Sequence, residues 1–226
     1  MPMAINMTDQ TGLLRLMAWL SPVFPTGGFS YSSGLETAVQ SGQLADQEAL
    51  RHWLKIKLDH GSLRNDAILL AEAWRSCANP SSLADVTELA LSRAGCRERY
   101  LELTAQADAF AATIKHWPDL SELDMPKPCA ICVAVGAVAG FARLDLSQTL
   151  IAYLHSIVSS QAQAAIRLSL VGQSGAAQIL AQLEPSIVTA AEFAEQSSLD
   201  DLGSATIAAE VMAMNHEYLP GRMFRS

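Results

Sequence analysis

CAICVAVGAVAGFA, residues 129–142, is the most apolar stretch of the chain and decides between a helical and a mixed fold. Its valines and isoleucines are typical of strands, but apolar and polar residues do not alternate along it, and glycines stand at positions 136 and 140. The missing two-residue period favours a helix. The stretch has 14 residues and ends at Arg143, which is too short to span a bilayer. We therefore expect a buried core helix.

Helical spacing of apolar residues continues on both sides of this stretch. Leu150, Leu154 and Ile157 recur at helical spacing, and Asp46 is placed to cap a helix that ends at Gly61. No series of strands and no internal repeat stands out. We predict an all-α protein, with a single helical bundle-like domain of roughly ten helices over residues 1–226. Further helices are expected near residues 13–20, 35–39, 65–78, 82–94, 100–114, 176–183, 185–196 and 204–219.

Two stretches at the ends of this domain are predicted to be irregular. Residues 1–10 are expected to form a disordered N-terminus, and residues 219–226 a flexible tail that docks a partner. Residues 117–128 carry three prolines, which makes them the best candidate for an internal boundary. Because both sides of this break are equally alanine-rich and helical, we expect one domain.

The composition excludes several classes of partner. The formal net charge is −8, and only 17% of the residues are charged, which argues against nucleic acid as the main partner. The N-terminus lacks the basic and apolar regions of a secretory signal. Four cysteines without such a signal suggest reduced thiols in the cytosol. We predict a soluble cytoplasmic protein that does not bind membranes.

No familiar catalytic motif is present in the sequence. The chain has no G-x-x-x-x-G-K-[ST] loop, no G-x-S-x-G elbow and no H-E-x-x-H pair. We therefore predict no catalytic residues, no resident metal, no cofactor and no enzymatic activity. The alternative is a helical metal-binding or redox protein that uses Cys129 and Cys132, with Cys77, Cys96 or His155 as further candidates. Two small thiols on a buried helix are the plainer interpretation.

Two segments carry more information than ordinary connections do. FPTGGFSYSSGLE, residues 24–36, packs glycines and aromatic residues between two helical patterns and is called the signature segment below. LPGRMFRS, residues 219–226, places two arginines around a phenylalanine and is called the tail. Arginine and aromatic side chains are the types that anchor interfaces.

Together these segments resemble the urease accessory protein F (UreF) family. Leu20–Glu36 resembles the family's N-terminal signature, and Val171-Gly-Gln173 its glycine–glutamine segment. Gly203–Thr206, His216-Glu217 and Arg222–Ser226 are similar to its C-terminal signature. The chain departs from the family pattern at Ser33, where histidine is frequent, and at Met223, where leucine is usual.

The resemblance implies an all-helical, cytoplasmic, homodimeric maturation factor that is not itself an enzyme. Its implied partners are UreD (UreH in some systems), the GTPase UreG and apo-urease, for nickel insertion and carbamylation of the active-site lysine. The tail and His216-Glu217 are expected to dock UreD, and the signature segment to face UreG or UreD. Glu36 is either a charged contact or a carboxylate at a helix N-terminus, and Gln173 either caps a helix or lines the dimer surface. The candidate partner-binding residues are Phe24, Pro25, Gly27, Phe29, Tyr31, Glu36, Gln173, His216, Glu217, Arg222, Phe224, Arg225 and Ser226.

Overall fold

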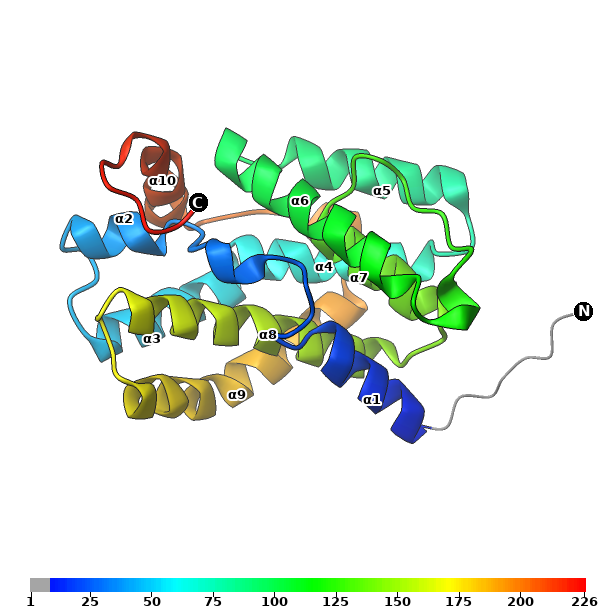
Figure 1. Cartoon of the computed structure of the whole chain (residues 1–226), viewed down its shortest axis with the longest axis horizontal. Helices are drawn as coiled ribbons and strands as arrows, with labels where there is room; N and C mark the ends of the chain where they lie inside the picture. The colour runs from blue at the N-terminus through cyan, green and yellow to red at the C-terminus, as the bar shows by residue number, and fades with distance from the viewer. Residues whose placement is uncertain (1–8) are drawn as a thin grey trace, which may run out of the picture.

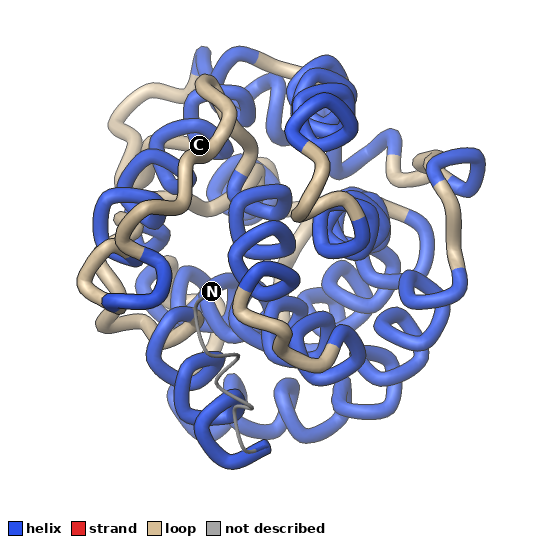
Figure 2. The backbone as a smooth tube through the Cα atoms, turned by 90° about the vertical axis from the view of Figure 1, so that its right-hand side faces the viewer, coloured by secondary structure: helices blue, strands red, loops and turns tan. Residues whose placement is uncertain are grey.

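Helix α4, Ser62–Arg75, runs through the centre of the molecule and packs against α3, α5, α7, α8 and α9 (Figure 1). The computed structural model describes residues 9–226. Within that range the chain forms ten α-helices and no strand, so the all-α prediction is confirmed. Figure 2 shows these helices joined by loops along the surface. The remaining helices are α1 Asp9–Trp19, α2 Leu35–Gln40, α3 Gln47–His60, α5 Pro80–Ser92, α6 Arg97–Ile114, α7 Ile131–Phe141, α8 Leu146–Arg167, α9 Gln173–Gln196 and α10 Ile207–Asn215, with 3₁₀ turns at Gly28–Ser30, Pro118–Leu120, Leu199–Asp201 and His216–Tyr218.

The apolar stretch 129–142 forms the buried core helix α7. Every residue from Ile131 to Ala139 is buried. Its glycines allow α7 and α4 to cross closely, because a Cβ at Gly136 would lie 2.2 Å from the Leu70 carbonyl oxygen. A Cβ at Gly140 would lie 2.5 Å from the Trp74 carbonyl oxygen. Tertiary packing thus overrides the strand preference of valine and isoleucine.

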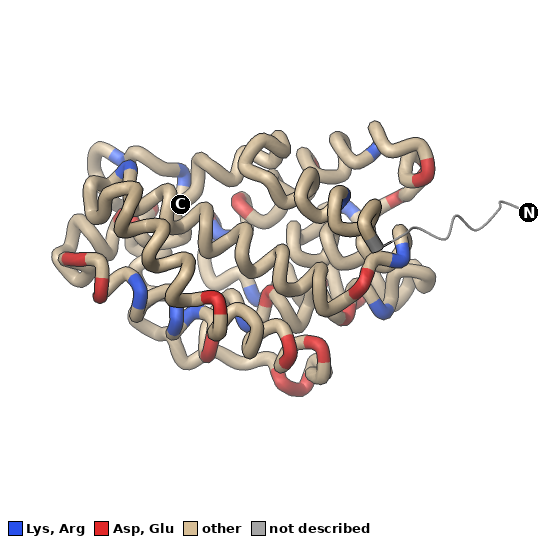
Figure 3. Tube along the Cα trace, turned by 90° about the horizontal axis from the view of Figure 1, so that it is seen from below, with Lys and Arg blue, Asp and Glu red and all other residues tan. Residues whose placement is uncertain are grey.

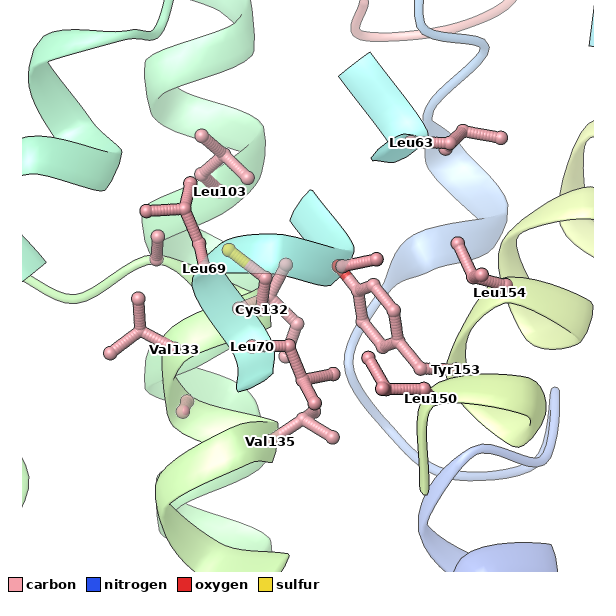
Figure 4. Packing of buried hydrophobic residues seen from close by; sticks show 14 of the residues in the cluster. Leu63, Leu69, Leu70, Leu103, Cys132, Val133, Val135, Leu150, Tyr153 and Leu154 are labelled. Atoms are coloured by element: carbon pink, nitrogen blue, oxygen red, sulfur yellow. The ribbon is translucent and has the colours of Figure 1, made fainter. Parts of the chain in front are cut away.

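The core continues from α7 to the long helix α8. Figure 4 shows Leu70 of α4 next to Val135 of α7, with Leu150 and Tyr153 of α8 on the side toward α8. Charged residues lie mainly around this core, and Figure 3 shows acidic and basic positions interspersed along the outer helices. Within residues 9–226, none of the helices combines the length and the apolar character that a membrane span needs.

One predicted break is wrong. The sequence predicts separate helices over residues 176–183 and 185–196, but α9 continues through Pro185. Ile179, Leu183 and Ile187 lie on one buried face across the proline. Burial of this continuous face against α8 and α3 outweighs the backbone hydrogen bond that proline cannot donate, a cost of about 3 kcal/mol.

Helix boundaries differ from the prediction by a few residues. Asp46 caps α3 as expected, its side chain accepting a hydrogen bond from the Ala49 amide at 2.8 Å. Helix α5 begins at Pro80, before the predicted start at residue 82, because the side-chain oxygen of Asn79 accepts hydrogen bonds from two amides of the first turn. The predicted disordered stretch 1–10 lies outside the described residues except for its last two, which begin α1.

Replacing Gly136 with alanine tests the close crossing of α4 and α7. We expect Gly136→Ala to lower the free energy of unfolding by about 3 kcal/mol, because the added methyl group must push two backbones apart. Urea denaturation followed by circular dichroism measures the change. Gly203→Ala is the matched control, since an added Cβ there meets no atom within 4 Å. Equal stability of the two variants would contradict a tight crossing.

Candidate functional site

The signature segment and the tail, predicted as separate features, lie side by side in the structure. The Arg225 amide donates to the Ser30 carbonyl at 2.8 Å, and the Ser32 amide donates to the Ser226 carbonyl at 2.7 Å. The Ser32 hydroxyl also donates to that Ser226 oxygen. Figure 1 shows the C-terminus beside α2 and α10. The last residues of the chain therefore pack along the backbone of the signature segment rather than extending from α10 as a free tail.

Glycines shape the signature segment for this contact. Gly27 and Gly34 have φ values of +74° and +85°, which favour glycine. At Gly34 an added Cβ would also lie 2.8 Å from the Ala213 nitrogen, so α10 approaches α2 closely at this point. Ser33, next to it, adopts φ +51° and donates its hydroxyl to Glu102 at 3.0 Å.

Glu36 is the central acceptor of the site. Its side chain is on α2 and the residue is only 1% exposed. Its carboxylate accepts the Met223 amide at 2.7 Å and the Phe224 amide at 3.0 Å, and lies 2.9 Å from Nε2 of His216. Burial alone would raise the pKa of Glu36, but the hydrogen bonds from the tail amides and His216 outweigh it and lower that pKa. Glu36 is therefore an internal anchor for the tail.

His216 joins Glu36 to a second carboxylate. The imidazole is fully buried, and its Nδ1 lies 2.7 Å from Glu98 of α6. The other oxygen of Glu98 accepts Arg222 Nη1 at 2.5 Å. The two predicted residues His216 and Arg222 thus meet on a carboxylate that the sequence analysis did not single out.

Glu102, one helical turn after Glu98, holds the end of the tail. It accepts the Ser226 hydroxyl at 3.0 Å and forms an ion pair with Arg99 at 3.1 Å. Arg99 also pairs with Asp66 at 2.6 Å. We call Glu36, Glu98 and Glu102 the carboxylate cluster. Glu98 and Glu102 are four residues apart and therefore lie on one face of α6. In a sequence, two acids with this spacing normally indicate a helix face exposed to solvent.

Two further charged residues, Lys57 and Asp66, are buried near Arg99. Burial lowers the pKa of Lys57 to about 8, and the nearby Arg99 charge adds to the effect. Burial raises the pKa of Asp66, although Arg99 opposes the rise. Attraction from Asp66 and Glu102 raises the pKa of Arg99 despite its burial, so the guanidinium stays charged. Asp66, Arg99 and Glu102 line a cavity of about 360 Å³, which the signature segment also lines.

The aromatic residues divide between the interior and the surface. Phe24 is buried against Phe110, with ring centroids 5.4 Å apart, and Tyr31 is buried as well. Phe29 is 60% exposed. Arg167 of α8 lies between Phe29 and the buried Phe224, at 4.0 and 4.2 Å from the ring centroids. The signature segment is therefore partly core and partly surface.

All but one of the other predicted partner residues lie at the surface. Pro25 and Gly27 line the cavity rim and are exposed. Glu217 is exposed, with a long ion pair to Arg97 at 3.8 Å. Arg225 is exposed, whereas Ser226 is buried. Gln173 lies at the exposed start of α9, outside the contacts of the carboxylate cluster.

The cysteine alternative finds little support. Cys129 and Cys132 are buried in the core, and burial raises the pKa of Cys129 to about 11 and that of Cys132 further above its ordinary range. The reactive or ligating thiolate is therefore disfavoured at neutral pH. Among residues 9–226, no three or more His, Cys, Asp or Glu side chains are grouped so that they could hold a metal ion.

Comparison with known proteins agrees with the resemblance. The sequence model of the UreF family matches residues 44–184. The urease accessory protein UreF of Allorhizobium ampelinum is 50% identical over 225 residues, which cover 96% of this chain and 98% of that protein. This chain belongs to the UreF family. The UreF of Brucella ovis is 49% identical and UreF 1 of Brucella anthropi 47% identical, each over 216 residues that cover 96% of this chain and 95% of the relative. The share of this chain that these UreF relatives cover is therefore wider than residues 44–184.

Replacing Glu36 with glutamine tests its role as the anchor. We expect Glu36→Gln to cost about 2–4 kcal/mol of unfolding free energy, because an amide donor would face the tail amides. Since the pKa of Glu36 lies below its ordinary 4.5, the charge contributes stability above about pH 4.5 and loses it at lower pH. The difference between parent and variant should therefore shrink below about pH 4.5 in pH-dependent urea denaturation. Exposed Glu122→Gln is the control and should change stability little at any pH.

Proposed function

We propose that this chain is a non-enzymatic adaptor in urease maturation, which acts with UreD to recruit the GTPase UreG to apo-urease for nickel insertion. Membership of the UreF family, whose relatives are named urease accessory proteins, carries this proposal. The absence of a phosphate-binding loop from the sequence is compatible with a partner that supplies the nucleotide chemistry. We place this assembly in the cytoplasm.

The tail and the end of α10 form the proposed docking surface for UreD. Tyr218 is 83% exposed and Met223 is 52% exposed, while Phe224 and Ser226 anchor the same segment from below. Arg222 and Arg225 add charge at the rim of this surface. A preordered segment with outward apolar side chains binds at a lower entropy cost than a disordered one. We call Tyr218, Met223 and their exposed neighbours Val211 and Met214 the tail face.

The exposed part of the signature segment is the proposed contact for UreG or UreD. Phe29, Pro25 and Gly27 are exposed there, held by Arg167 and by the tail beneath them. Phe24, Tyr31 and Glu36 support this surface from the interior instead of contacting a partner directly.

A homodimer has its own candidate surface, away from the tail. Leu13 of α1 is 52% exposed and lines an apolar groove between α1, α8 and α9, and Met17, one turn further along α1, is 63% exposed. A protruding apolar ridge beside a groove on one face is the self-complementary arrangement of a two-fold interface. His155 and Glu184 also line this groove, so each could pair with the other residue across the axis. A second copy of the chain is therefore the proposed occupant, and Gln173 lies outside the groove lining.

Substitution of the tail face tests UreD docking without removing the buried anchors. We expect the double change Tyr218→Ala and Met223→Ala to weaken co-purification with UreD at least tenfold, because both exposed apolar contacts are lost. The fold should be unchanged by circular dichroism, since neither side chain is buried. Phe141→Ala, 48% exposed on α7, is the control for losing an exposed apolar side chain. Undiminished assembly with UreD and full urease maturation by the double variant would refute the docking role.

A charge on α1 tests the dimer surface separately. We expect Met17→Glu to convert a dimer to a monomer, because it buries an unpaired carboxylate at the proposed interface. Light scattering after size-exclusion chromatography gives the mass directly. Phe141→Glu, an equivalent change at another exposed position, should leave the dimer intact. A monomeric parent would contradict the proposed homodimer. A dimer that survives Met17→Glu would show that the interface lies elsewhere.

A further inference from the structure

The cavity of about 360 Å³ is surrounded by buried polar groups that the protein leaves without partners. Tyr153 and Gln161 of α8 line it, and each is 3% exposed. Within residues 9–226, neither the Tyr153 hydroxyl nor Oε1 of Gln161 has a hydrogen-bond partner. Nε1 of the buried Trp19, which lines the cavity from the end of α1, has none either. Three of the six such atoms in this part of the chain therefore belong to residues around one cavity.

The neighbouring contacts determine what each of these groups can still do. Nε2 of Gln161 donates to the Ser32 carbonyl at 3.1 Å, so its Oε1 is left as an acceptor. Burial raises the pKa of Tyr153 well above its ordinary value, so its hydroxyl keeps the proton and can donate. Because buried polar groups are normally hydrogen-bonded, these residues favour an occupant that has both an acceptor and a donor.

Other walls of the cavity are apolar and suit a flat ring. Phe24 of the signature segment and Phe110 of α6 both line it, with their ring centroids 5.4 Å apart. Val135 of α7 and Ile157 of α8 add aliphatic surface. A concave site of roughly 300–1,000 Å³ with mostly apolar walls and a few placed polar groups is typical of small-molecule binding.

The charged residues at the cavity compensate one another. Asp66 and Glu102 line it together with Arg99, which pairs with them at 2.6 and 3.1 Å. Two carboxylates and one guanidinium sum to −1, and the buried Lys57 beside them adds +1 at pH 7, because its pKa is lowered only to about 8. The four charges therefore sum to zero, and a charged ligand would leave a net charge in a buried site.

We propose that this cavity binds a small, uncharged aromatic carboxamide. Its ring packs against Phe24 and Phe110, its carbonyl accepts from the Tyr153 hydroxyl, and its N–H donates to Oε1 of Gln161. Such a ligand joins α8 to the signature segment, since both line the cavity. The site lies within one chain, so it can fail while the role in urease maturation stands.

Titration of the full-length, ¹⁵N-labelled chain with nicotinamide or benzamide tests the site. The chain has four tryptophans, and the indole N–H of Trp19 reports on the cavity directly. We expect a saturable shift of this signal with a Kd of about 1 mM, and smaller shifts at Trp53 and Trp74, which do not line the cavity. The absence of a saturable shift at Trp19 with both amides would overturn the proposal.

Two analogues test the chemistry of recognition. Nicotinate, which replaces the amide with a carboxylate, should bind at least tenfold more weakly than nicotinamide, because it brings a charge into a balanced site. Toluene keeps an aromatic ring but lacks the amide, and it should also bind more weakly. Equal affinity for toluene would show an apolar cavity only and would contradict recognition of the amide.

Tyr153→Phe removes the proposed donor and keeps the ring. We expect binding of nicotinamide to weaken about two- to tenfold, as loss of one hydrogen bond predicts. The fold should persist, because the change removes a hydroxyl that has no partner in the protein. Tyr100→Phe, on α6 and outside the cavity lining, is the control and should keep the parental Kd. An unchanged Kd in Tyr153→Phe would contradict the assigned hydrogen bond.

Ser160→Leu tests whether the ligand occupies this cavity. Ser160 is half-buried and lines it, so the larger side chain should fill part of the space and weaken binding at least tenfold. Ser159→Leu makes the same change at the neighbouring half-buried serine of α8, which does not line the cavity, and should leave binding intact. A parental Kd in a folded Ser160→Leu variant would place the ligand elsewhere and overturn the site. If that variant does not fold, the parent titration and Tyr153→Phe still decide the proposal.

Discussion

The buried carboxylate of Glu36 is the constraint on which the candidate site depends. A charge that is 1% exposed must be compensated within the protein, and here the compensation comes from two tail amides and from His216. Removing these donors would leave an unpaired buried charge, at a cost of several kcal/mol. The position of the tail is thereby tied to that of α2. Glu98 extends the same tie to α6.

This constraint determines which parts of the site can meet a partner. Phe224 and Ser226 are buried and hold the tail against the domain, whereas Tyr218 and Met223 are exposed. The segment therefore combines an internal anchor with an exposed face of fixed shape. Binding to a preformed face saves the entropy of ordering several residues, so modest contact area can suffice for useful affinity. Phe29 is held in a comparable way by Arg167.

The helices were predictable because their information is local, and the site was only partly predictable because its information is not. Residues 129–142 were assigned correctly from the lack of alternation. Pro185 was misread because a local rule competes with burial along the whole of α9. Glu98 was missed because its partners lie 118 and 124 positions away, and a helix carboxylate normally indicates solvent. The signature segment and the tail were each conspicuous, but nothing local indicated that they pair.

Apolar residues at the position of Glu36 could bury as much surface as the carboxylate does. The advantage of the carboxylate is that it fixes the position of the tail along the signature segment. An apolar tail could shift along its groove by one residue at little cost, exchanging one contact for a similar one. Glu36 prevents this, because its two oxygens match two successive amides and a slip would misplace both. Such buried ionic contacts contribute more to register than to stability.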